Sequence, residues 1–228
     1  MSKRYALVFF LGILLVMVTA ACVGSSRSAD GSSGAVNGTP VAVAKVLGSF
    51  YPIEGTHYQL ATISTSQNES GRGYDLSNLF SYGRSDYSVY NYVFLDVDTE
   101  TAYALLPTND NAVLSIQGYP TPGPAEPVSG EKTPVAWWLY TLVKQDTNQD
   151  DQLSYLDKQT LAISDVGGKG YTEIIPNVDQ VLGNVLKDET ILLIIYRSDH
   201  KNYLAHIDLP GRVVTKTTEL PDFGVNIK

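Results

Sequence analysis

Six oxygen-bearing side chains occupy regular positions in the segment 146–157. They are Asp146, Asn148, Asp150, Gln152, Ser154 and Asp157, which stand at positions 1, 3, 5, 7, 9 and 12 of that segment. Alternate residues of a tight loop can turn their oxygens towards one centre, and calcium is a hard cation that takes six to eight oxygen ligands. The spacing therefore predicts a calcium site, with the backbone carbonyl of Gln152 as the seventh-position ligand. The alternative is an acidic turn without metal, because Asp and Asn are common in turns.

This segment resembles the calcium-binding loop of EF-hand proteins, with two departures. Asp151 stands at position 6, where glycine is expected, and must reach a left-handed backbone conformation at some cost. Asp157 replaces the usual Glu at position 12 and is a shorter arm, so both changes weaken binding. The flanks 139–143 and 160–163 read as strands rather than helices. The segment is thus similar to the calcium loops that join blade strands in some secreted propeller proteins, and its expected role is to staple a long hairpin.

The amino terminus has the pattern of an export signal. Lys3 and Arg4 precede an apolar run at 5–18, and small residues follow at 19–21. A transmembrane anchor is one alternative, although the run is shorter than the ~20 residues that a spanning helix needs. A simple cleaved signal is the other alternative. Residues 1–21 are therefore expected to form a signal peptide.

Cys22 directly follows those small residues, and the segment resembles the lipobox of bacterial lipoproteins. That resemblance implies cleavage before Cys22, acylation of its thiol, and attachment of the chain to a membrane of the cell envelope. Val23 rather than Asp after the cysteine resembles the signal for the outer membrane in enterobacteria-like sorting, with the protein facing the periplasm. Residues 22–40, rich in Gly, Ser and Ala, are expected to be a flexible tether.

Composition limits the partners and the means of stabilisation. The chain carries 16 basic and 24 acidic residues. Loss of residues 1–21 removes two basic residues and no acidic ones, so the mature chain has 14 against 24, a net charge of −10. This balance argues against nucleic acid and against electrostatic binding to anionic lipid. Cys22 is the only cysteine, so no internal disulfide is expected. Residues 41–228 are long enough for a single domain with its own core.

Three segments of this domain share one pattern: a strand that ends in Asp, a tight turn, and a second strand that ends before or at Pro. The three Asp residues are Asp96, Asp165 and Asp208. An Asp at the start of a turn can accept hydrogen bonds from backbone N–H groups ahead of it, and Pro ends a strand because it lacks an N–H donor. Tyr and β-branched residues favour pleated surfaces, and no strong helical period appears beyond residue 40. The pattern predicts an all-β domain.

Further strands are expected before each hairpin, at 58–64, 135–143 and 190–197, with short ones at 112–117 and 180–186. The result is about three four-stranded units in an antiparallel meander, which resemble the blades of TolB-like β-propeller proteins. A β-sandwich or barrel is the alternative. The apolar run Ile191–Tyr196 predicts a strand buried on both faces, and the Pro-rich segment 119–134 predicts an exposed loop.

No catalytic motif stands out in the sequence. The chain lacks a nucleophile-elbow serine, a zinc-protease helix motif and a phosphate-binding glycine loop. We therefore expect a protein that is not an enzyme but a lipid-anchored binding or scaffold module, with an envelope protein or a glycan as partner. The alternative is a metal-dependent envelope hydrolase, or an accessory subunit of one, that uses Asp150, Asp151 and Asp157. Exposed edge strands also make a homodimer conceivable.

Overall fold

The computed structural model describes residues 44–65, 89–120 and 134–221. The predicted signal peptide, Cys22 and the tether up to residue 40 lie outside the described residues, and so do residues 121–133 of the predicted Pro-rich loop. The start of that loop was placed wrongly, since Tyr119 and Pro120 are the last residues of a strand. No helix within the described ranges is long and apolar enough to cross a membrane.

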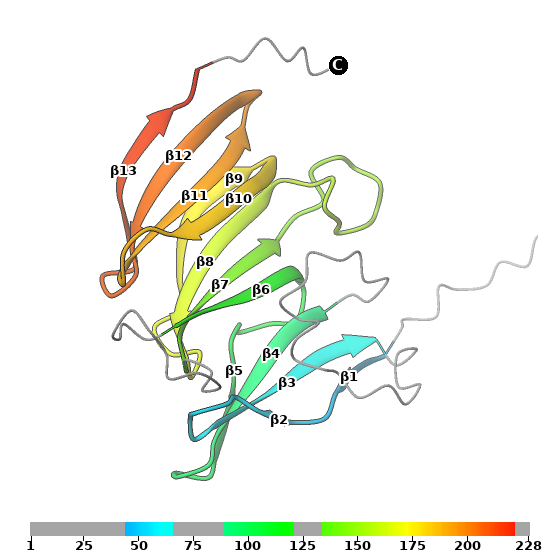
Figure 1. The fold of residues 1–228 in the computed structure, drawn as a ribbon. Helices are drawn as coiled ribbons and strands as arrows, with labels where there is room; N and C mark the ends of the chain where they lie inside the picture. Colours follow the sequence, from blue (N-terminus) through cyan, green and yellow to red (C-terminus); the bar gives the residue numbers. More distant parts are fainter. Residues whose placement is uncertain (1–43, 66–88, 121–133, 222–228) are drawn as a thin grey trace, which may run out of the picture. The chain divides into compact units, whose positions relative to one another are not determined.

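Thirteen strands make up the described part of the chain (Figure 1). They are β1 (Lys45–Leu47), β2 (Tyr51–Pro52), β3 (Tyr58–Thr65), β4 (Val89–Asp96), β5 (Thr101–Ala104), β6 (Ala112–Pro120), β7 (Val135–Val143), β8 (Gln159–Asp165), β9 (Thr172–Val178), β10 (Gln180–Leu186), β11 (Ile191–Ser198), β12 (Lys201–Asp208) and β13 (Val213–Glu219).

The strands fall into three consecutive antiparallel units. In the first, β1 and β2 both pair with β3, which is followed by β4 and β5. The second unit is β6–β9 and the third is β10–β13, each paired in chain order. A single residue pair, Val89 with Val113, joins β4 to β6, so the first two units share one hydrogen-bonded sheet. The predicted all-β meander of about three four-stranded units is confirmed.

The Asp at the end of a central strand caps the following turn in every unit. Asp96 Oδ1 accepts hydrogen bonds from the backbone N–H of Asp98 and Thr99, at 3.2 and 3.3 Å. Asp165 Oδ1 accepts one from Lys169 N–H at 2.7 Å, and Asp208 Oδ2 accepts one from Gly211 N–H at 3.0 Å. Each carboxylate thus satisfies donors that the strand ladder leaves free, which is the role that the sequence pattern predicted.

The same turns connect neighbouring units through charge. Lys169, four residues after Asp165 in the second unit, lies 3.6 Å from Asp96 Oδ2 of the first. Arg212, four residues after Asp208 in the third unit, lies 3.9 Å from Asp165 Oδ2 of the second. A basic side chain therefore reaches back to the turn aspartate of the preceding unit. We refer to these two contacts as the turn ion pairs. Since each pair includes a partly exposed side chain, each contributes little to stability.

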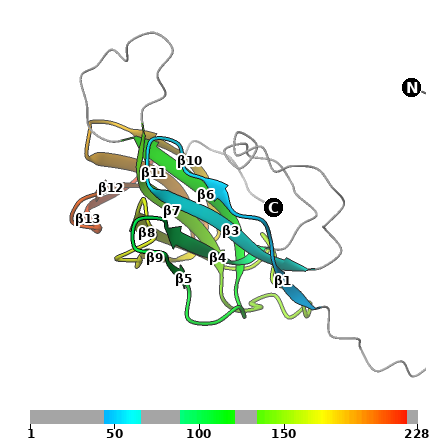
Figure 2. The ribbon, with the colours of Figure 1, turned by 90° about the horizontal axis from the view of Figure 1, so that it is seen from below.

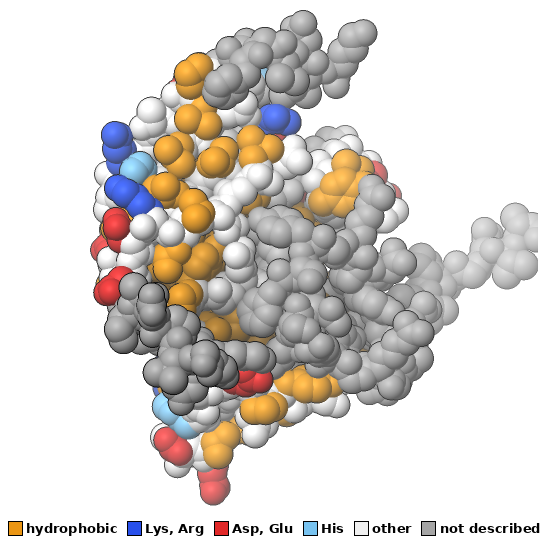
Figure 3. Space-filling model, viewed as in Figure 1, with side chains coloured by type: hydrophobic (Ala, Val, Ile, Leu, Met, Phe, Trp, Pro, Cys, Tyr) orange, Lys and Arg blue, Asp and Glu red, His pale blue; other side chains and the backbone are white. Residues whose placement is uncertain are grey.

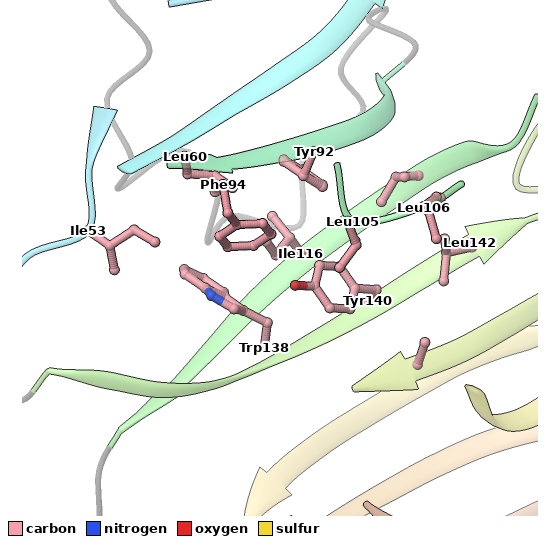
Figure 4. Close-up of a cluster of buried hydrophobic side chains, with 12 residues drawn as sticks. Ile53, Leu60, Tyr92, Phe94, Leu105, Leu106, Ile116, Trp138, Tyr140 and Leu142 are labelled. Carbon is pink, nitrogen blue, oxygen red and sulfur yellow. The ribbon is translucent and has the colours of Figure 1, made fainter. Parts of the chain in front are cut away.

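Two hydrophobic clusters lie between consecutive units, with the second unit in the middle. In both views, β6 and β7 lie between the first-unit strands β3 and β4 and the third-unit strands β11 and β12 (Figures 1 and 2). The first cluster joins units one and two. In it Phe94, Trp138 and Tyr140 point towards one another and are almost fully buried (Figure 4). Tyr140 also exchanges a 2.8 Å hydrogen bond with Ser164, so its hydroxyl is satisfied inside the core.

The second cluster joins the other face of the middle unit to the third. Leu161 and Ile163 of β8 pack with Leu192, Ile194 and Ile207 of β11 and β12, all fully buried. Neighbouring residues along β7 and β8 point to opposite faces of the sheet. Since both faces are covered, most residues of these two strands are buried, and the half-buried exceptions, 135–137 and 165, lie at strand ends.

One sequence prediction about β11 was wrong. The run Ile191–Tyr196 was expected to be buried on both faces, but only alternate residues of the strand are buried. Leu192, Ile194 and Tyr196 face the second cluster, whereas Ile195 is 36% exposed. The reason is positional: the third unit is the last one in the described part of the chain, and no further sheet among the described residues covers its outer face.

Gly168 lies where the turn of the middle unit packs closely against the first unit. It has φ = +79°, and a Cβ at this position would collide with the ring of Phe94. We expect Gly168→Ala to lower the free energy of unfolding by more than about 1 kcal/mol, from left-handed strain and overpacking together. Urea unfolding would measure this change. The matched control is Gly183→Ala in β10, where a Cβ would meet no atom within 4 Å. Equal effects of the two substitutions would contradict the packing described here.

Candidate functional site

The predicted calcium loop joins the two strands that lie at the centre of the molecule. It runs from residue 146 to 157 between β7 and β8. Asp146 begins it by accepting three backbone hydrogen bonds: Oδ1 from Gln149 and Asp150 at 2.7 and 3.2 Å, and Oδ2 from Asp151 at 2.8 Å. One carboxylate therefore bends the chain back on itself within six residues.

Asp157 closes the loop in the same manner and is buried. Its Oδ1 accepts hydrogen bonds from the backbone N–H groups of Thr147 and Asn148, at 2.7 and 3.2 Å. Its Oδ2 accepts one from Ser154 N–H at 2.9 Å. Burial raises the pKa of Asp157, but these hydrogen bonds outweigh burial and hold the pKa below its ordinary value. The carboxylate thus ties both arms of the loop together as an anion.

The remaining predicted ligands lie on the exposed part of the loop. Asn148 Oδ1 accepts a hydrogen bond from Asp150 N–H at 3.0 Å, and Asp150 Oδ1 accepts one from Gln152 N–H at 2.9 Å. Ser154 Oγ accepts one from Leu156 N–H at 3.2 Å. Asp151, at the position where glycine is usual, has φ = +62°. The left-handed backbone expected from the sequence at position 6 is therefore present.

The donor set suits calcium, but its oxygens point at backbone amides in this structure. Carboxylate, amide and hydroxyl oxygens are the ligands that calcium prefers. Asp146 and Asp157 each use both oxygens as hydrogen-bond acceptors within the loop. Their carboxylates do not form, with Asp150, a group whose ligand atoms all lie within 4.8 Å of one another. An ion would have to draw these side chains together, and the calcium site stays a prediction.

A different polar group was missed by the sequence analysis. Among the described residues, His57, Asp96 and Asp98 are the one set of three potential metal ligands whose atoms lie within 4.8 Å of one another. His57 Nε2 is 3.8 Å from Asp96 Oδ1, and Nδ1 is 3.8 Å from Asp98 Oδ2. Nothing in the sequence brings His57 to residues 96–98, since the contact depends on the pairing of β3 with β4. The turn aspartate of the repeat was the only available signal.

This group behaves as a charge cluster in which Asp96 is already balanced. Burial raises the pKa of Asp96, but hydrogen bonds from Thr99 and the charges of His57 and Lys169 together hold it below its ordinary value. The two ring nitrogens of His57 face different carboxylates, so one metal ion cannot use both. The ammonium of Lys169 also lies over the rings of Tyr58 and Tyr103. These neighbours explain the position of Lys169 without an added ligand.

Lys158 links the end of the loop to the third unit. Its Nζ lies 2.5 Å from Asp179 Oδ1, between β9 and β10, and 3.0 Å from Asp199 Oδ1, in the β11–β12 turn. Hydrogen bonds to these two carboxylates raise the pKa of Lys158. The residue after Asp157 is therefore held by the neighbouring unit, and the loop end is fixed from both sides.

The chain matches no family model and no curated protein. Among solved structures it is similar to the β-propeller domain of the Trilobed protease from Pyrococcus furiosus, at 10% identity and a TM-score of 0.36. It is also similar to luciferin-regenerating enzyme, at 11% identity and a TM-score of 0.38. These matches cover 78% and 80% of this chain but 44% and 49% of the two others, so the chain spans about half the length of each.

The expectation that the protein is not an enzyme has to be corrected. One similar structure is an enzyme and the other is a domain of a protease. At this low identity the likeness concerns the fold alone and assigns no activity.

The lowered pKa of Asp157 predicts that this residue contributes to the loss of folding stability at acidic pH. Because its pKa is lower when folded than the ordinary ~3.9, its stabilising contribution is complete above that pH and is lost as pH falls through the folded value. We expect Asp157→Asn to lower the free energy of unfolding at neutral pH, and to flatten its decline below about pH 4. The decline does not vanish, because Asp96 and Asp179 also have lowered pKa values.

Urea unfolding across this pH range, in the presence of a chelator, measures both effects. The control is Asp151→Asn, because the Asp151 carboxylate accepts no hydrogen bond among the described residues, and Asn tolerates its positive φ. Identical pH profiles for wild type and Asp157→Asn would contradict this role of Asp157.

Proposed function

We propose that this chain is a lipid-anchored protein of the bacterial envelope, whose β domain serves as a binding or scaffold module stapled by calcium at residues 146–157. The observation that carries the proposal is the ordered loop between β7 and β8, in which Asp146 and Asp157 organise the turn and six oxygen donors keep the calcium spacing. The anchor rests on the sequence around Cys22.

The lipid anchor explains how an acidic protein stays at a membrane. A mature chain of net charge −10 gains nothing from anionic lipid head groups. Acyl chains contribute about 0.8 kcal/mol per buried CH2 group regardless of charge, so attachment would rest on Cys22. The Gly- and Ser-rich tether would then let the β domain reach partners near the membrane surface, and envelope proteins and glycans are the candidates.

Calcium would act on the whole domain rather than on the loop alone. The loop connects β7 and β8, which contribute side chains to both hydrophobic clusters. An ion that binds only the folded loop stabilises the folded state by an amount that grows with its concentration.

A second candidate is a metal-dependent envelope hydrolase or its accessory subunit. The observation that favours it is the exposure of Asp150 and Asp151 at the loop tip, where an ion would remain open to solvent. Complete coordination of a bound ion by protein oxygens would count against this alternative, because no position would remain for a water nucleophile.

The calcium proposal predicts a metal-dependent stability. We expect the melting temperature of the mature chain to rise with calcium, by a stabilisation of about 2.7 kcal/mol when calcium exceeds its dissociation constant a hundredfold. Asp146→Ala should abolish that rise, and the readout is the calcium-dependent shift rather than the basal melting temperature. Asp151→Gly is the control and should keep the shift or enlarge it, because glycine adopts positive φ without strain. A wild-type protein that does not respond to millimolar calcium would refute the site.

The anchor predicts a covalent modification at one residue. Expression of the full chain in a bacterial host with labelled palmitate should give labelled protein in the membrane fraction. Cys22→Ser should lose the label and leave the membrane fraction, because no other thiol is present. Val23→Asp is the matched control: in an enterobacterial host it should keep the label but move from the outer to the inner membrane. Retention of label by Cys22→Ser would show that Cys22 is not the acylated residue.

A further inference from the structure

The outer face of the third unit carries apolar side chains along β10, β11 and β12, and the polar pair His206–Lys216 lies beside them on β12 and β13. Residues paired across neighbouring strands share a face, and the pairs Leu193–Val185, Ile195–Leu204 and Leu193–His206 all alternate with the buried set. Val185 is 57% exposed, Leu182 41% and Ile195 36%. Hydrophobic side chains gather over the β10–β13 sheet in the space-filling view (Figure 3). We refer to the side chains of Val185, Leu193, Ile195 and Leu204 as the outer patch.

The equivalent faces of this chain are buried by a neighbouring sheet. Both faces of the middle unit and the inner faces of units one and three take part in the two hydrophobic clusters. An exposed apolar face with this alternation is typical of a surface that packs against another sheet. The charged residues at the two ends of the outer patch indicate which sheet would cover it.

The outer patch lies between a basic and an acidic end of the sheet. At one end Arg197 spans Asn202 and Gln180, donating to their amide oxygens at 3.2 and 3.3 Å. At the other end lies Asp208, paired with Val213 and Ile191. Asp208 is the third turn aspartate, and among the described residues no cation forms a turn ion pair with it, unlike Asp96 and Asp165.

We propose that the outer patch is the contact surface of a homodimer, in which two copies of the β10–β13 sheet pack face to face about a two-fold axis that runs across the strands. Such an axis places Ile195 against Leu193 of the second copy. It also places Arg197 beside Ile191 and Asp208 of the second copy. The interface is self-complementary, as a two-fold contact requires. Arg197 then supplies to Asp208 the cation that Lys169 and Arg212 supply to the other two turn aspartates.

The charges disfavour the other arrangement of two copies, in which the third unit of one would pack on the first unit of the next. The turn ion pairs place the residue four positions after one turn aspartate against the aspartate of the preceding unit. In the first unit that residue is Glu100, where the other units carry Lys169 and Arg212. Continuation of the series would bring Glu100 to Asp208, and two carboxylates repel one another.

Sedimentation of the mature chain, with Cys22→Ser to remove the acyl anchor, tests the proposal. We expect a dimer for the parent chain and a folded monomer for Ile195→Lys, which places a charge at the centre of the patch. Leu47→Lys is the matched control, because Leu47 is 52% exposed and lies in the first unit, paired with Ile63 and away from the outer patch. It should leave the dimer intact. Circular dichroism melting establishes that each variant is folded.

A charge exchange tests the orientation of the two copies. Arg197→Asp should raise the dimer dissociation constant at least about tenfold, and Arg197→Asp combined with Asp208→Lys should restore it. A monomeric parent chain would overturn the proposal. A dimer that survives Ile195→Lys would also overturn it and would point to pairing at the β13 edge. A dimer that Leu47→Lys dissociates would overturn it as well and would point to the head-to-tail arrangement. Failure of the charge exchange to restore binding would overturn the two-fold geometry.

Discussion

The burial of both faces of the middle sheet is the constraint on which the rest of this structure depends. Side chains of β7 alternate between the two clusters: Trp138, Tyr140 and Leu142 pack with the first unit, whereas Leu139 packs with the third. In the described part of the chain neither cluster joins the two outer units to each other, so each outer unit packs on the middle one. A polar group buried on either face of such a sheet is costly unless it finds a partner. The Tyr140–Ser164 hydrogen bond supplies one, whereas Trp137 Nε1 of β7 is buried without a hydrogen-bond partner among the described residues.

The calcium-type loop therefore lies where it can stabilise both hydrophobic clusters. It is the connection between β7 and β8, and an unfolded loop would leave these two strands joined by a long and flexible linker. Asp146 and Asp157 shorten that linker by collecting backbone donors from across the loop. Lys158 then ties its end to Asp179 and Asp199 of the flanking segments. A staple at this point supports both clusters at once, whereas the same staple in an outer unit would support one.

Much of the fold could be predicted because its signals are local. The turn aspartates predicted three hairpins, because each one contacts backbone groups within four residues of itself. The strands 135–143 and 180–186 were predicted with the bounds that the structure gives. The left-handed backbone at Asp151 followed from its place in the loop. The cluster of His57 with Asp96 and Asp98 could not be foreseen, because only the pairing of two strands distant in sequence brings these residues together.

The wrong prediction for β11 is informative in its own right. An unbroken apolar run indicates a strand with both faces covered, and the sequence of Ile191–Tyr196 carries that signal although the described part of the chain covers only one face. The apolar residues are explained if the missing cover comes from a second copy. A lipid-anchored dimer would also hold two acyl anchors, and two linked attachments raise the residence time at a membrane far beyond that of one. The face that the described residues leave uncovered and the lipid anchor that the first residues predict would then both strengthen attachment to the membrane.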